Sequence, residues 1–192
     1  MSFGVLALQG DFEAHLRILR RVGVEAGAVR HAGELSSLAG LVIPGGESTT
    51  LLNLMADEPW GEAIRGLHGR GAALLGTCAG AILLAREVRP AQASLGLVDV
   101  TIERNAYGRQ VDSFEARLDA PALGGGLRAV FIRAPRIRGA GPGVEVLARL
   151  DGEPVLVRQG RVLAATFHPE LADDTRLHAA FAEAGAVALA RE

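Results

Sequence analysis

The stretch that most constrains the fold of this chain is residues 72–85, where two apolar runs meet at a turn of small residues. The first run has the length and composition of a buried strand, and the second is rich in helix-forming residues. Between them stands Gly76-Thr77-Cys78-Ala79-Gly80, whose small side chains allow a sharp strand-to-helix turn. Such a turn aims its apical residue outward, as a nucleophile elbow presents its serine. We therefore predict that Cys78 is presented for chemistry.

Cys78 is the only cysteine of the chain, which excludes a disulfide within it. At the N-terminus of a helix, the positive end of the helix dipole favours the thiolate form of a cysteine. A lone cysteine can equally be a small buried hydrophobe. Cys78 by itself is compatible with both roles, so the neighbouring motifs must decide between them.

Strand-like and helix-like patterns alternate through the first half of the chain. We predict strands at residues 3–8, 25–29, 41–43 and 72–76, and helices at 12–22, from about 49, at 60–68 and from 78. This alternation predicts a parallel sheet covered by helices on both faces.

The second half of the chain contains mainly strand patterns separated by turns. Asp151-Gly152 and Gln159-Gly160 are turn signals that favour antiparallel pairing. With no linker or internal repeat, we expect residues 1–192 to form a single domain. The predicted strands are residues 97–103, 110–114, 129–133, 145–150, 154–158 and 161–167, followed by a helix at 174–190.

The composition excludes several classes of function. The net charge is −2 and the basic residues are scattered, which argues against a nucleic-acid partner. Charged residues and glycines interrupt the apolar runs well before the ~20 residues that a membrane span needs. All 20 basic residues are arginine, so lysine chemistry is excluded in this chain. One cysteine and no signal-peptide pattern favour a cytoplasmic location.

A second motif, Thr166-Phe167-His168-Pro169-Glu170, closes the last predicted strand. In extended chain, residues two apart share a face, so Glu170 could orient the imidazole of His168 while its other nitrogen serves a nucleophile. The tripeptide alone is equally compatible with a surface loop. The other four histidines have no metal-ligand spacing, and we expect neither a metal site nor a cofactor.

A third motif, the glycine-rich segment 44–50, follows the third predicted strand and opens a helix. Ser48 or Thr49 could simply cap that helix. The same geometry directs backbone N–H groups into the space beside the strand ends, where they can bind an oxyanion. Ligands of parallel sheets bind at the carboxyl ends of strands, where both this loop and Cys78 are expected.

Taken together, these motifs resemble the triad-type glutamine amidotransferases. Within that group the chain is most similar to the glutaminase subunits of pyridoxal phosphate synthase complexes. The matching segments occur in the expected order and are residues 8–15, 45–50, 76–80, 104–110, 131–135 and 167–170.

The resemblance implies an α/β fold, a flavodoxin-like three-layer sandwich with a mainly parallel central sheet and an antiparallel extension in the second half. It implies a catalytic triad of Cys78, His168 and Glu170, with Gly46 and Ala79 supplying backbone donors to the oxyanion. It further implies hydrolysis of L-glutamine and delivery of ammonia to a synthase subunit that makes pyridoxal 5'-phosphate. The residues implied to contact glutamine are Gly46, Glu47, Ser48, Arg104, Ile132 and Arg133.

Two other interpretations remain open from the residues. One is a stand-alone cysteine hydrolase of similar fold, such as a γ-glutamyl hydrolase or an intracellular peptidase, against which the segments around Arg104 and Arg133 argue. The other is a non-catalytic regulatory subunit, against which the complete set of Cys78, His168 and Glu170 argues.

Overall fold

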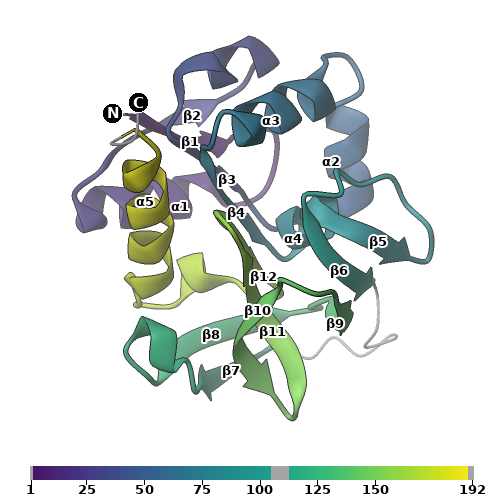
Figure 1. Cartoon of the computed structure of the whole chain (residues 1–192), viewed down its shortest axis with the longest axis vertical. Helices are drawn as coiled ribbons and strands as arrows, with labels where there is room; N and C mark the ends of the chain where they lie inside the picture. Colours follow the sequence, from purple (N-terminus) through teal and green to yellow (C-terminus); the bar gives the residue numbers. More distant parts are fainter. Residues whose placement is uncertain (1, 105–112, 190–192) are drawn as a thin grey trace.

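The computed structural model describes residues 2–104 and 113–189 of the chain. Its centre is a seven-stranded sheet in the order β10-β11-β12-β4-β3-β1-β2 (Figure 1). The five strands from β12 to β2 are parallel, and β11 and β10 extend them in antiparallel pairing. These strands are β1 Ser2–Leu6, β2 Glu25–Val29, β3 Gly40–Ile43, β4 Ala73–Thr77, β10 Glu145–Leu150, β11 Glu153–Gln159 and β12 Val162–Ala165.

The order of the parallel strands, numbered among themselves, is 2-1-3-4-5, which is the flavodoxin-like order. Helices cover both faces, with α1 and α5 on one side and α2, α3 and α4 on the other (Figure 1). The predicted three-layer sandwich with its antiparallel extension is confirmed. The helices are α1 Phe12–Val22, α2 Ser48–Leu54, α3 Trp60–Gly69, α4 Ala79–Leu84 and α5 Arg176–Leu189.

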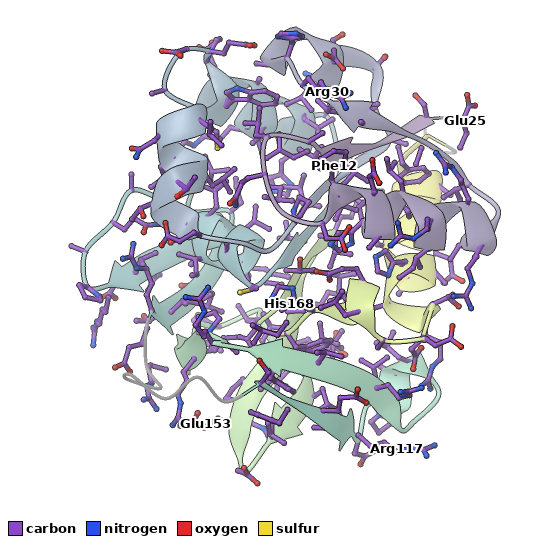
Figure 2. The ribbon with its side chains drawn as sticks, turned by 180° about the vertical axis from the view of Figure 1, so that it is seen from behind. Phe12, Glu25, Arg30, Arg117, Glu153 and His168 are labelled. Atoms are coloured by element: carbon purple, nitrogen blue, oxygen red, sulfur yellow. The ribbon has the colours of Figure 1, made fainter. Side chains whose placement is uncertain are left out.

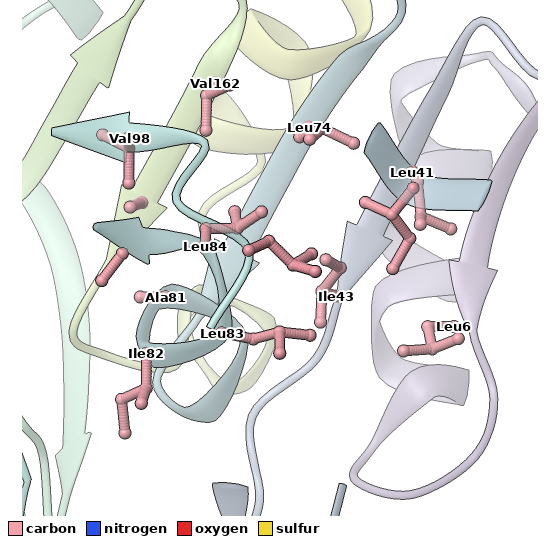
Figure 3. Close-up of a cluster of buried hydrophobic side chains, with 14 of the residues drawn as sticks. Leu6, Leu41, Ile43, Leu74, Ala81, Ile82, Leu83, Leu84, Val98 and Val162 are labelled. Carbon is pink, nitrogen blue, oxygen red and sulfur yellow. The ribbon is translucent and has the colours of Figure 1, made fainter. Parts of the chain in front are cut away.

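Each central strand contributes alternate side chains to two separate cores. Leu41 and Ile43 of β3 pack with α2, α3 and α4, whereas Val42 between them packs with α1 and α5. Figure 3 shows the first of these cores, in which Leu74 of β4 lies near the side chains of α4. Burial on both faces explains why these strands are continuous apolar runs in the sequence.

The remaining strands form two small sheets that contact β10 and β11, the antiparallel edge of the central sheet (Figure 1). The predicted helix after Cys78 ends at Leu84, and Ala85–Arg89 forms strand β5, which was not predicted. In β5, Ala85 and Val88 are buried and Arg86 and Glu87 are exposed. The two sheets are β5 (Ala85–Arg89), β6 (Val98–Glu103) and β9 (Arg136–Ala140), and β7 (Ser113–Leu118) with β8 (Leu127–Ile132).

The antiparallel pairing predicted from the turns at Asp151-Gly152 and Gln159-Gly160 is confirmed in β10–β11 and β11–β12. In the small sheets β5 and β6 pair in parallel, and β9, which was not predicted, pairs antiparallel with β6. Residues 105–110 of the predicted glutamine-contact segment, and residues 110–112 of the predicted strand 110–114, lie outside the described residues. Among the helices that the structure describes, none combines the length and apolarity that a bilayer span requires.

Candidate active site

Cys78 lies at the turn between β4 and α4, as predicted. Its backbone angles, φ 48° and ψ −103°, are in a region that non-glycine residues rarely adopt. Its N–H donates to the carbonyl of Ala165 at 2.8 Å, which ties the turn to the end of β12. The residue is 6% exposed. Strain of this kind is maintained by the surrounding structure and is concentrated at functional sites.

Two glycines allow this turn to pack closely against the sheet. A Cβ atom on Gly80 would lie 2.0 Å from the carbonyl oxygen of Ile43, and one on Gly76 would lie 2.6 Å from the backbone of Gly80. The predicted need for small residues therefore has a specific cause, which is the close approach of α4 to β3 and β4.

The Gly80→Ala substitution is expected to lower the free energy of unfolding by about 1–3 kcal/mol, because backbone must move to admit the new methyl group. Gly27→Ala is the matched control, since nothing lies within 4 Å of a Cβ atom there. Urea unfolding of both variants checks this prediction. Equal unfolding midpoints in the two variants would contradict the close approach.

His168 and Glu170 meet as predicted, but not in extended chain. β12 ends at Ala165, and Pro169–Leu171 forms a 3₁₀ turn that brings the two side chains together. His168 Nδ1 lies 2.7 Å from Glu170 Oε1. The His168 N–H donates to the carbonyl of Val130 in β8 at 2.8 Å, which fixes the turn from outside the central sheet. Figure 2 shows His168 in the interior, above the ribbon of the small sheets.

The surroundings of His168 favour its protonated form. Burial lowers the pKa of its imidazole, but hydrogen bonds and charge from Cys78 and Glu170 outweigh burial and raise that pKa to about 10. At neutral pH His168 is therefore an imidazolium held between Cys78 and Glu170. An imidazolium beside a cysteine favours the thiolate form, which is the nucleophile.

The glycine-rich loop after β3 passes directly beside these groups. A Cβ atom on Gly45 would lie 2.4 Å from Cε1 of His168, so glycine leaves room for the imidazole. Gly46 has φ 131°, in the region that favours glycine. The loop therefore places backbone amides near Cys78. Ala79, the first residue of α4, has an N–H group without an intrahelical partner because of its position.

The cap of α2 differs from the predicted one. Glu47, and neither Ser48 nor Thr49, is the N-cap residue, and its Oε2 accepts hydrogen bonds from Thr49 Oγ1, Thr50 N–H and Thr50 Oγ1. Hydrogen bonds from Thr49 and Thr50 lower the pKa of the Glu47 carboxyl. Because all three hydrogen bonds end on Oε2, Oε1 is left for a cationic ligand. Ser48 instead donates to Gln92 Oε1 at 2.9 Å.

A pocket of about 160 Å³ joins the separate parts of the site. Arg133, directly after β8, has φ 44°. Cys78 and Arg133 are two of the three described non-glycine residues with positive φ, and both line this pocket. All six residues expected to contact glutamine, with Cys78 and His168, are among its lining residues: Gly46, Glu47, Ser48, Cys78, Ile82, Arg104, Ile132, Arg133, Pro135 and His168.

Several residues of the site were not identified from the sequence. Gln9 accepts a hydrogen bond from the Glu47 N–H at 3.2 Å, and Gln92 supports Ser48. Behind Glu170, His15 of α1 and His178 of α5 form a fully buried pair, with His15 Nδ1 2.8 Å from His178 Nε2. The position of His15 on the apolar face of helix 12–22 is a signal that could have indicated its burial.

The buried histidine pair stays neutral well below the usual histidine range. Burial lowers the pKa of His15, with further lowering by His178 and His168, and burial lowers the pKa of His178 to about 4. Between about pH 6.5 and pH 4 the unfolded chain therefore binds more protons at these positions than the folded chain.

We expect the free energy of unfolding to fall on acidification through this range, by about 1.4 kcal/mol per pH unit for each such histidine. His178→Leu removes one of the two contributions, so its stability should fall less steeply than that of the wild type. Urea unfolding at about pH 7 and about pH 5 measures the difference. Parallel losses in the two proteins would contradict the neutral pair.

Comparison with known proteins identifies the family. The model of the SNO glutamine amidotransferase family matches residues 5–186. The pyridoxal 5'-phosphate synthase subunit PdxT of Koribacter versatilis is 53% identical over 182 residues, covering 94% of each chain. That of Thermus thermophilus is 54% identical over 187 residues, covering 96% of this chain and 97% of the relative.

A solved structure agrees with the sequence comparisons. A crystal structure of a glutamine amidotransferase superimposes with a TM-score of 0.90 at 52% identity, covering 96% of this chain and 98% of the other. The family match spans the nucleophile turn, the glycine-rich loop and the His168 turn alike. The chain therefore belongs to the SNO glutamine amidotransferase family.

Proposed function

We propose that this chain hydrolyses L-glutamine to glutamate and ammonia at the Cys78 pocket, as the glutaminase subunit of a pyridoxal 5'-phosphate synthase. The observation that carries the proposal is the single pocket in which a strained cysteine, a charged histidine and three groups suited to an amino acid meet. The names of the relatives, which are synthase subunits, support the same assignment.

The charges around the pocket suit the ends of a free amino acid. The guanidinium groups of Arg104 and Arg133 match an α-carboxylate, which they can bind through paired N–H donors. The Oε1 atom of Glu47 suits an α-ammonium group. A substrate held at both ends in this way would direct its side-chain carboxamide toward Cys78.

In the proposed reaction the Cys78 thiolate attacks the carboxamide carbon, and a tetrahedral oxyanion forms. Backbone N–H groups of Gly46 and Ala79 stabilise this oxyanion. The His168 imidazolium protonates the amide nitrogen, ammonia leaves, and a γ-glutamyl thioester remains on Cys78. His168 then takes a proton from water, which attacks the thioester and releases glutamate and the thiolate. Glu170 stabilises the imidazolium throughout.

The direct test is the rate of hydrolysis of glutamine, of asparagine and of a γ-glutamyl peptide, followed by the glutamate or aspartate released. The proposal predicts turnover of glutamine alone. Asparagine bound by the same α-groups is one methylene too short to reach Cys78, and the substituted amide of a γ-glutamyl peptide needs more room than a pocket of about 160 Å³ offers. Preferential cleavage of the γ-glutamyl peptide would instead favour a γ-glutamyl hydrolase. Iodoacetamide labelling of Cys78 near neutral pH is the companion measurement, since a non-catalytic subunit with an inert thiol should react slowly.

We further propose that the partner is the synthase subunit, which receives the ammonia, and that its binding activates hydrolysis. Gly46, with φ 131° and Gln9 packed against its Cα, can change the direction of its peptide group at low cost. We expect the synthase subunit to raise kcat/KM at least about tenfold, equivalent to ~1.4 kcal/mol of transition-state stabilisation.

Gly46→Val should abolish this rise, because a branched side chain is strained at that φ and would collide with Gln9. Steady-state kinetics of both proteins with and without the synthase subunit check the prediction. Equal kcat/KM of the wild type in both conditions would refute activation and leave the assignment of the triad intact.

A further inference from the structure

Glu170 is a buried carboxylate, and the hydrogen-bond donor of one of its two oxygens is not obvious. Its side chain is 2% exposed, and a carboxylate removed from water is unstable unless both oxygens have polar partners. Oε1 is hydrogen-bonded to His168 Nδ1, which lies 2.7 Å away. Within the described parts of the chain, Oε2 has no aligned hydrogen-bond donor. The group in contact with it is His15, whose Nε2 lies 3.3 Å away.

The protonation of His15 follows from its neighbours. His15 Nδ1 contacts His178 Nε2 at 2.8 Å, and His15 Nε2 faces both Glu170 Oε2 and Thr77 Oγ1, the latter at 3.4 Å. A bare nitrogen lone pair at Nε2 would point at a carboxylate oxygen and be repelled. The neutral ring is therefore stabilised with its proton on Nε2, where it can donate to Oε2.

His178 completes the same assignment. With the proton of His15 on Nε2, its Nδ1 is an acceptor, so His178 must donate from Nε2. The Nδ1 atom of His178 is then a bare acceptor, in agreement with its lack of a partner among the described residues. Every donor now points the same way, from His178 to His15 to Glu170. Burial keeps both rings neutral, so neither adds a cation that would compete with His168 for the carboxylate.

We propose that His15, oriented by His178, is a positioning residue for glutamine hydrolysis, which holds Oε2 of Glu170 so that Oε1 faces His168. The inference rests on the proposed function for its effect on turnover. His15 does not line the pocket and does not touch substrate. It acts through Glu170, whose place it fixes from the opposite side by joining α1 and α5 to the 3₁₀ turn.

Two substitutions of similar size separate positioning from packing. In His15→Gln the amide nitrogen can occupy the place of Nε2 and still donate to Glu170, whereas in His15→Asn it can reach only the place of Nδ1. With the full chain and the synthase subunit, we expect kcat of the Asn variant to fall about 10–100-fold, by analogy with the loss that follows removal of a hydrogen-bond partner behind a metal-binding side chain. The Gln variant should stay within about threefold of wild type. KM should be unchanged in both.

The second readout does not depend on turnover. Because Cys78 is the only cysteine, iodoacetamide modifies one thiol, and its rate against pH follows the thiolate that His168 stabilises. In the Asn variant Glu170 is less well placed, so the acid limb of this pH profile should move to higher pH by about one unit. At a fixed pH on that limb, the alkylation rate should then be about tenfold lower than that of the wild type. In the Gln variant the acid limb should stay at the wild-type position.

A folded Asn variant with wild-type kcat and wild-type alkylation profile would overturn the proposal. So would equal losses in the Gln and Asn variants, because a purely structural histidine makes no distinction between them. If His15→Asn does not fold, the same comparison is made at His178 with His178→Gln and His178→Asn. The amide nitrogen of the Gln variant can take the place of Nε2 and still donate to His15, so this variant is the one expected to keep wild-type behaviour. A wild-type complex that releases no ammonia would refute the proposed function, while the alkylation profile would still test His15.

Discussion

Replacement of Cys78 by alanine is expected to abolish glutamine hydrolysis and to leave the fold intact. Loss of a triad nucleophile in a related mechanism lowers kcat by on the order of 10⁶. Alanine fits the space because the thiol is a small side chain at a turn that is held from both sides by β4 and β12. Ammonia release, measured with the synthase subunit present, checks the loss of activity, and urea unfolding checks the fold.

Cys78→Ser is the informative companion, because it keeps the size and a nucleophilic atom but lacks an accessible anion. We expect it to be nearly as inactive as the alanine variant. Measurable turnover by the alanine variant would contradict the assignment of the nucleophile. High activity of the serine variant would show that the imidazolium–thiolate pair is not needed.

Glu170→Gln is expected to lower kcat by several orders of magnitude, with ~10⁴ observed for the analogous change in a serine triad. Glutamine keeps the volume but removes the charge that raises the pKa of His168, and its amide N–H₂ would face either His168 or His15. The pKa of His168 should fall, and the acid limb of Cys78 alkylation should move to higher pH. Steady-state kinetics and alkylation rates measure the two effects.

Glu183→Gln is the matched control, since Glu183 is an exposed carboxylate on α5. It should leave kcat within experimental error of wild type. A loss of less than about tenfold in the Glu170 variant would mean that His168 is oriented by another group and that the buried carboxylate is structural.

The parts of this fold that the sequence predicts are those where one physical effect dominates. β3 and β4 are buried on both faces, so their continuous apolar runs locate them to within one residue. The nucleophile turn is equally predictable from the sequence, because only small residues allow α4 to approach Ile43. β5 was missed because Ala85 continues an apolar helix-forming run, and only tertiary packing ends that helix at Leu84.

The candidate site is predictable in its members and less so in its geometry. The motifs indicated that Cys78, His168 and the glycine-rich loop would meet, and the structure brings them to one pocket. The 3₁₀ turn of His168 depends on its hydrogen bond to Val130, a contact between distant segments. The His15–His178 pair joins residues 163 apart in the sequence, and no local pattern encodes such a contact.

The central claim is that glutamine reacts in the pocket beside Cys78. The most direct measurement is a crystal structure of the Cys78→Ala variant with the synthase subunit and glutamine. We expect the carboxamide carbon beside residue 78, the α-carboxylate on Arg104 and Arg133, and the α-ammonium on Glu47. Glutamine bound elsewhere, such as in the groove of about 460 Å³ between the 3₁₀ helix Ala32–Ser37 and α3, with the Cys78 pocket empty, would contradict it.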